Sequence, residues 1–167
     1  MKRNSSNGIR DRALGSLTYL LPMSAVVILG VFLFRQFPIL AIIFSPLIQI
    51  ALIGSLRIVD FISVRFVVWA VLFFAVVRNR NIGHFIRFNA MQAVLLDVVV
   101  SLFKVLIQMI LILFGKFDFA ASMLEVLATT AFLAVISGSF YSLFFAVQGK
   151  YANIPMISDA ADFNARY

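Results

Sequence analysis

The sequence predicts an all-α polytopic membrane protein, a bundle of four transmembrane helices with an extra re-entrant or interfacial segment at about 37–56. Apolar residues make up 63% of 167 positions and charged residues only 13%. The mean hydropathy is +1.05, and several apolar runs are long enough to cross a hydrocarbon core of about 30 Å. We therefore divide the chain into a basic polar segment (1–12), a transmembrane domain (13–147) with spans at about 13–34, 61–77, 90–114 and 119–147, and a polar tail (148–167).

The first span follows a basic segment that contains Lys2, Arg3, Arg10 and Arg12. This beginning is similar to a signal peptide, but the apolar run is too long and no small-residue cleavage site follows it. Pro22 lies inside the run and removes one backbone hydrogen bond, so we expect the helix to begin at or kink near Leu21.

The run at 37–56 is long enough to span, but Pro38 and Pro46 interrupt it. The distribution of positive charge favours a segment that does not cross. The amino-terminal segment, a basic collar formed by Arg78, Arg80 and Arg87, and the polar tail then all lie on the same side of the membrane, as the positive-inside rule prefers.

The span at 61–77 carries Arg65 near its start. A long arginine side chain can extend to the membrane surface from that position, so Arg65 need not mark a buried site. The collar that follows has two interpretations, which both remain open: a docking surface for acidic partners or anionic head groups, or a basic loop that only sets topology.

The span at 90–114 carries a polar stripe. Asp97, Ser101, Lys104 and Gln108 follow one another at steps of four, three and four, which places them on one face of a helix. A charge that faces acyl chains is costly, so the stripe is expected to face other helices, another subunit or water. It either lines a polar path for a substrate or forms an internally satisfied seam between helices.

A short polar turn, Gly115 to Asp118, predicts that the last two spans are antiparallel neighbours. Glu125 in the last span lies at a depth comparable to Gln108 and could share a polar interior with Lys104. Small residues recur at every fourth position of this span, which predicts a face for close helix packing: Thr130, Ala134, Gly138, Ser142 and Ala146.

No pattern typical of an enzyme is present, and we expect no catalytic site, cofactor or metal. The chain contains no Cys and a single histidine, His84, which is expected to be a solvated loop residue. Neither glycine-rich phosphate-binding pattern occurs. Nucleic acid is not expected as a partner, because the basic residues mostly flank apolar segments and topology explains them.

The collar and its surroundings resemble a known family. Val77-Arg78-Asn79, Arg87-Phe88-Asn89-Ala90-Met91-Gln92-Ala93 and Leu95-Leu96-Asp97 are similar to the twenty-kilodalton subunit family of the translocon at the inner envelope of chloroplasts. Shorter matches follow the same order along the chain: Tyr19-Leu20-Leu21-Pro22, Phe37-Pro38, Tyr141-Ser142, Gly149-Lys150, Ile154-Pro155 and Ser158-Asp159-Ala160-Ala161.

The resemblance implies four spans, both termini and the collar on the stromal side of the plastid inner envelope, and a channel-forming or scaffold subunit for protein import. Implied partners are other translocon subunits and precursor proteins in transit; membrane lipids and further copies of the chain are expected as well. The absence of a long transit peptide favours a plastid-encoded, cyanobacterial or processed chain; a cyanobacterial one would lie in the plasma or thylakoid membrane. Two other functions stay open: a small-solute or ion transporter with a relay of Asp97, Lys104 and Glu125, and a structural assembly factor.

Overall fold

The computed structural model describes residues 8–59 and 62–166, which are helical apart from one short β-hairpin and the connecting segments. The elements are α1 (Ile9–Leu17), α2 (Leu20–Val26), η1 (Val27–Gly30), α3 (Val31–Gln36), α4 (Pro38–Ile43), α5 (Ser45–Ser55), β1 (Arg57–Val59), β2 (Ile62–Ser63), α6 (Val64–Val71), η2 (Leu72–Val77), α7 (His84–Phe114), α8 (Asp118–Val147) and α9 (Ile157–Arg166). Part of the predicted basic segment 1–12, the start of the predicted span 61–77 and the last residue of the tail lie outside the described residues.

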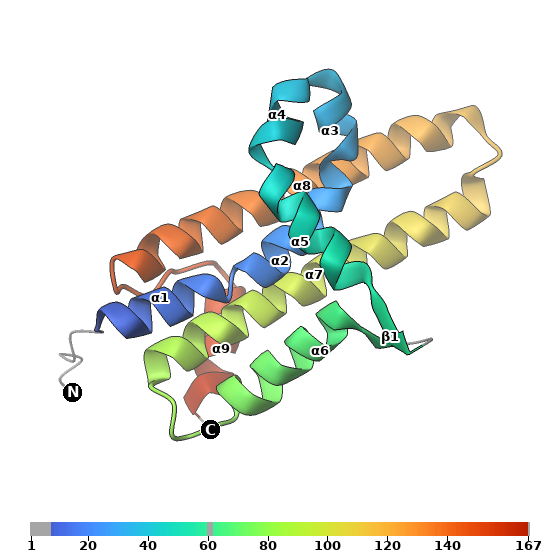
Figure 1. Cartoon of the computed structure of the whole chain (residues 1–167). Coiled ribbons are helices and arrows are strands. Elements are labelled where there is room, and N and C mark those ends of the chain that lie inside the picture. Colours follow the sequence, from blue (N-terminus) through green and yellow to red (C-terminus); the bar gives the residue numbers. More distant parts are fainter. Residues whose placement is uncertain (1–7, 60–61, 167) are drawn as a thin grey trace.

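The longest unit is the antiparallel hairpin of α7 and α8, which extends well past the other helices (Figure 1). The two helices contain 31 and 30 residues, about 45 Å each at ~1.5 Å per residue. In the turn between them, the backbone N–H of Phe117 donates to the carbonyl of Phe114 at 2.9 Å. The antiparallel pairing predicted from the short polar turn is confirmed.

The first predicted span corresponds to a helical path from Ile9 to Gln36 that is bent. Pro22 has no N–H to donate to the carbonyl of Thr18, and that carbonyl accepts from the N–H of Leu21 instead, at 3.2 Å. The break therefore lies at residues 18–19, one turn before the proline and close to Leu21, near which a helix start or kink is predicted. This is the position where a proline ring crowds the carbonyl four residues earlier.

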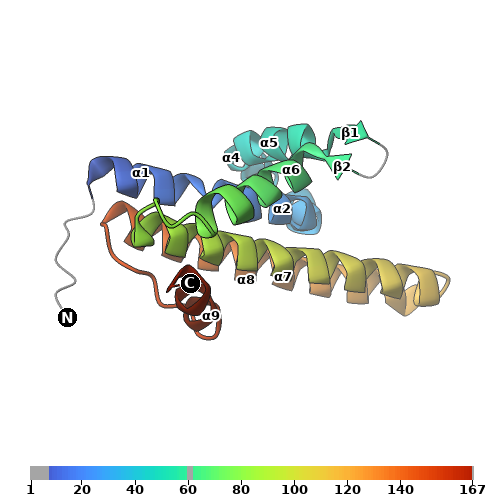
Figure 2. The same ribbon diagram turned by 90° about the horizontal axis from the view of Figure 1, so that it is seen from below.

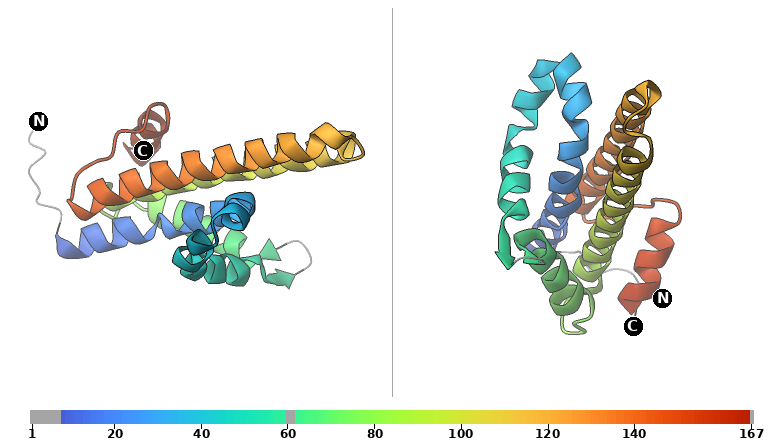
Figure 3. Two further views of the ribbon diagram at one scale, coloured as in Figure 1. Left: turned by 90° about the horizontal axis from the view of Figure 1, so that it is seen from above. Right: turned by 90° about the vertical axis from the view of Figure 1, so that its right-hand side faces the viewer.

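The segment at 37–56 folds back on the first helix (Figure 3). The chain leaves the helical conformation at Phe37, and Pro38 and Pro46 each occupy the first turn of a short helix, α4 and α5, where their missing N–H costs no bond. The rings of Phe34, Phe44 and Phe132 meet at centroid distances of 5.4–5.7 Å and hold this turn against α8. The re-entrant or interfacial character of the segment stays a prediction.

The helix within 61–77 is shorter than its neighbours. It begins at Val64, where the hydroxyl of Ser63 accepts from the N–H of Phe66 at 3.2 Å, and the β1–β2 hairpin precedes it. The eight residues of α6 and the six of η2 give about 21 Å at ~1.5 Å per residue, less than the ~30 Å of a hydrocarbon core. Within the described residues, three helices are long and apolar enough to cross a membrane: Ile9–Gln36, His84–Phe114 and Asp118–Val147.

The elements are arranged around the α7–α8 hairpin. Figure 2 shows α1, α2, α5 and α6 on one side of the hairpin and α9 on the other. The start of α1, the loop at 78–83 and α9 all lie toward the same end of the hairpin, opposite the turn at Gly115 (Figure 1). The chain is thus an all-α polytopic membrane protein with its basic segments gathered at one end.

The helix α8 does not pack through one continuous row of every fourth residue. Ser142 and Ala146 are buried, but Gly138 is half-buried and Thr130 and Ala134 are exposed. At 3.6 residues per turn, a step of four drifts by about 40°, so this row winds away from the interface. The buried positions follow mixed steps of three and four instead: Ala128, Ala131, Val135, Ser139, Ser142 and Ala146.

Candidate functional site

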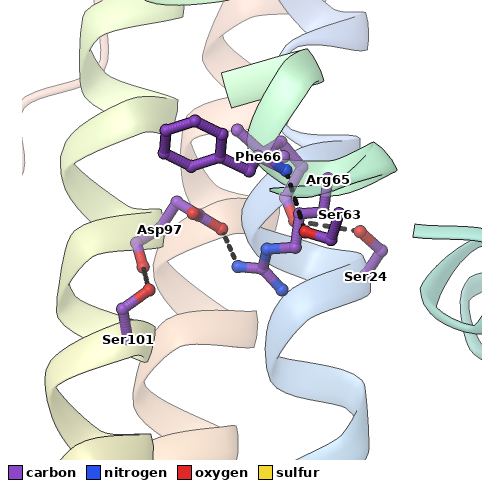
Figure 4. Close-up of polar contacts among 7 residues, drawn as sticks. Ser24, Ser63, Arg65, Phe66, Asp97 and Ser101 are labelled. Atoms are coloured by element: carbon purple, nitrogen blue, oxygen red, sulfur yellow. Dashed lines mark hydrogen bonds and ion pairs between the residues drawn. The ribbon is translucent and has the colours of Figure 1, made fainter. Parts of the chain in front are cut away.

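An ion pair inside the apolar part of the molecule joins α6 to α7. Arg65, in the first turn of α6, directly contacts the carboxylate of Asp97 on α7 (Figure 4). Asp97 is only 4% exposed. Arg65 therefore marks a buried site, although its sequence position did not require one: its guanidinium neutralises a buried acid, which is a far more favourable position than an isolated charge in an apolar layer.

The remaining stripe residues lie farther along α7 and are less covered. Ser101 is exposed, and its hydroxyl donates to the backbone carbonyl of Asp97 at 3.0 Å. Lys104 is half-buried and Gln108 is exposed. The helix α6 begins beside Asp97 and does not extend along α7 to these later positions, so it does not shield them. The four residues therefore share a face as predicted, but only the first is fully buried by its own chain.

A groove of about 430 Å³ lies beside the ion pair, between α6 and α7. Its walls include Arg65 and Asp97 together with Trp69, Ser101 and Val105. Trp69 stacks on the neighbouring ring of Phe73 at 5.5 Å between centroids. Asp97 and Ser101 of the polar stripe thus border an open groove rather than a packed core.

Glu125 is engaged by a residue that the sequence did not indicate. Its carboxylate accepts a hydrogen bond from the amide of Gln36, at the end of α3, at 3.0 Å. Within residues 8–59 and 62–166, neither Glu125 nor Lys104 belongs to an ion pair shorter than 4 Å. The structure therefore brings Asp97 to Arg65 and Glu125 to Gln36, and it does not assemble Asp97, Lys104 and Glu125 as a relay.

A buried polar cluster, absent from the predicted site, joins three parts of the chain. The hydroxyl of Tyr19 lies 2.9 Å from the side-chain oxygen of Asn89 and 2.7 Å from that of Gln92. The amide of Gln92 donates to the hydroxyl of Ser158 on α9 at 3.0 Å. Tyr19, Asn89 and Gln92 are fully buried. The signal in the sequence was two amides three residues apart in an apolar run.

The collar contains two kinds of arginine. Arg87 is 6% exposed, and its Nε donates to the carbonyl of Val77 at 2.7 Å, which fixes the end of η2. Arg78 and Arg80 are exposed.

His84 is not a solvated loop residue: its ring lies 3.2 Å from the hydroxyl of Tyr151 and 3.5 Å from the carboxylate of Asp162, so it helps to hold the tail.

Comparison with known proteins gives one consistent result. Residues 9–161 match the family model described as chloroplast import apparatus Tic20-like. The chain is 38% identical over 168 residues to a Tic20 family protein of Synechocystis sp., with all of both chains covered. It is 35% identical to protein TIC 20-II, chloroplastic, of Arabidopsis thaliana, over 90% of this chain and 70% of that protein.

A third relative is the Tic20 family protein Ycf60 of Pyropia yezoensis, 31% identical over 93% of this chain and 76% of that one. The matched region includes every element from α1 to the first half of α9, and with them the ion pair, the collar and the buried polar cluster. The chain belongs to the Tic20 family.

Proposed function

We propose that the protein is a channel-forming or scaffold subunit of a membrane translocon that imports precursor proteins. The family match and the names of the chloroplast relatives support an import role. The location that fits a plastid chain is the inner envelope membrane, with both termini stromal. A cyanobacterial chain would occupy the plasma or thylakoid membrane.

The observation that carries the proposal is the uncovered part of the polar stripe. Ser101 and Gln108 are exposed and Lys104 is half-buried on a helix that otherwise presents Leu, Val and Ile to its surroundings. Polar groups at membrane depth are normally covered by protein or water. This face of α7 is therefore suited to a partner subunit, a second copy of the chain or a passing precursor.

A single chain is too small to enclose a wide aqueous pore. Within the described residues it offers three long apolar helices, and the surface of the far half of the hairpin is mostly apolar, with Leu102, Val105, Ile112 and Val126 more than half exposed. Conduction would require several copies or other subunits that supply the rest of the wall.

Cysteine crosslinking tests the proposal, because the chain has no native Cys. Single substitutions Ser101→Cys, Lys104→Cys and Gln108→Cys are introduced, and an import precursor is arrested in transit. We expect crosslinks from these positions and none from the control Leu102→Cys, whose native side chain is 64% exposed on another face of α7. If the precursor crosslinks to none of the three positions, the remaining role is that of a scaffold that does not contact the precursor.

A further inference from the structure

A cavity of about 790 Å³ lies between the end of η2, the loop that follows it and α9. This volume is in the range of about 300–1,000 Å³ that ligand sites occupy. The cavity combines an apolar floor with two basic side chains and an amide, and it is lined by Phe73, Val77, Arg78, Arg80, Phe163 and Asn164. None of these lining residues is acidic.

A third arginine adds positive charge behind this cavity. Arg87 donates through Nε to the carbonyl of Val77, a residue of the cavity wall. Its side chain is buried, yet its Nη2 has no hydrogen-bond partner, and within the described residues no carboxylate lies within ion-pair distance of Arg87. A buried guanidinium without an anion is unfavourable, so the local charge balance calls for a negative group.

The position of the cavity indicates the kind of anion. Phe73 and Val77 belong to an apolar helix, whereas Arg78 and Arg80 belong to the polar loop just beyond it. Phe163 on α9 is 64% exposed and supplies an apolar rim. The cavity thus crosses the border between the apolar and polar parts of the molecule, where the phosphates of a bilayer lie against basic residues.

We propose that this cavity binds an anionic phospholipid. The phosphate lies between Arg78 and Arg80, and one acyl chain follows Phe73 and Val77 toward the membrane interior. Asp162, the acid that precedes Phe163 on α9, lies near His84, with 3.5 Å between carboxylate and ring nitrogen. The bound lipid would join the loop to α9 and so stabilise the docked tail, a role beyond setting topology and independent of protein import.

Native mass spectrometry of the purified full chain with added phosphatidylglycerol or phosphatidylcholine tests this proposal. We expect phosphatidylglycerol to bind more tightly than phosphatidylcholine, and Arg78→Gln/Arg80→Gln to weaken phosphatidylglycerol binding about twenty-five-fold, at roughly fivefold for each basic residue at a membrane surface. The control Arg10→Gln/Arg35→Gln removes the same charge from exposed positions outside the cavity. An equal loss in the control would show diffuse attraction and overturn the proposal.

A competition experiment separates the lipid from other anions. Soluble glycerol phosphate and an acidic peptide are each added to the phosphatidylglycerol complex, and we expect neither to displace the lipid at equal concentration. Displacement by either would mean that the acyl chain contributes nothing, and the lipid assignment would be wrong. If the double variant does not fold, Arg78→Gln alone, at an exposed position, is expected to weaken binding about fivefold.

Discussion

At the scale of single residues, the Arg65–Asp97 ion pair gives a direct prediction. Asp97→Asn leaves the guanidinium of Arg65, whose side chain is 22% exposed, without its buried carboxylate partner. Removing one partner of a buried pair costs about 3 kcal/mol or more, whereas replacing both by apolar residues is often nearly neutral. We expect Asp97→Asn to lower the unfolding temperature of the purified protein, and Arg65→Leu/Asp97→Leu to recover most of the loss. A single variant as stable as the native protein would contradict the ion pair.

The buried hydroxyl of Tyr19 gives a second residue-scale prediction. Tyr19→Phe removes a hydroxyl whose single proton is donated to one of the buried side-chain oxygens of Asn89 and Gln92, so one of these oxygens loses its hydrogen-bond donor. An unsatisfied buried polar group costs about 1–3 kcal/mol. The unfolding temperature should therefore fall for Tyr19→Phe. It should not change for Tyr141→Phe, a matched change at a tyrosine that is 43% exposed.

The sequence indicated which residues were polar inside the membrane but not their partners. Asp97 was identified because a charge interrupts an apolar run, yet Arg65 lies 32 positions away in the chain. Their contact depends on how α6 docks against α7, which no local pattern encodes. The same holds for Tyr19 and Gln92, 73 positions apart. These residues, far apart in the sequence, meet only in the folded chain.

At the scale of elements, the sequence predicted the three long helices well because length and hydropathy decide them. It overestimated the length of the helix at 61–77, which begins only at Val64. An apolar run continues through a β-hairpin as readily as through a helix. The break in the first helix lies two to three residues before Leu21, near which the sequence predicted it. Within the chain, the row of small residues on α8 marks only part of the buried face, because a strict period of four does not match the helical repeat.

The connection from α8 to α9 contains a position that requires glycine. Gly149 has a φ of +74°, and a Cβ there would lie 2.7 Å from Nε of Arg12. Gly149→Ala should cost about 1–2 kcal/mol from the left-handed backbone alone. Limited proteolysis is expected to cut the tail faster in this variant. Gly83→Ala is the control, because nothing lies within 4 Å of its added Cβ.

At the scale of the whole molecule, the gathering of the basic segments at one end predicts membrane sidedness. Lys116 lies in the turn at the far end of the α7–α8 hairpin, and Lys150 lies just after α8 at the basic end. Lys116→Cys and Lys150→Cys should react with a membrane-impermeant thiol reagent from opposite sides of sealed vesicles. Reaction of both from the same side would mean that the hairpin does not cross the membrane.

The central claim is that the polar stripe beyond the ion pair is covered by protein or water in the assembled complex. The most direct measurement is the oxygen accessibility of a spin label at Gln108→Cys, compared with one at Leu106→Cys, on the opposite face of α7, whose native side chain is 44% exposed, in the complex reconstituted in a bilayer. Oxygen concentrates in the acyl region, so we expect low accessibility at position 108 and high accessibility at position 106. Equally high values at both positions would show that the stripe faces lipid and would contradict the account.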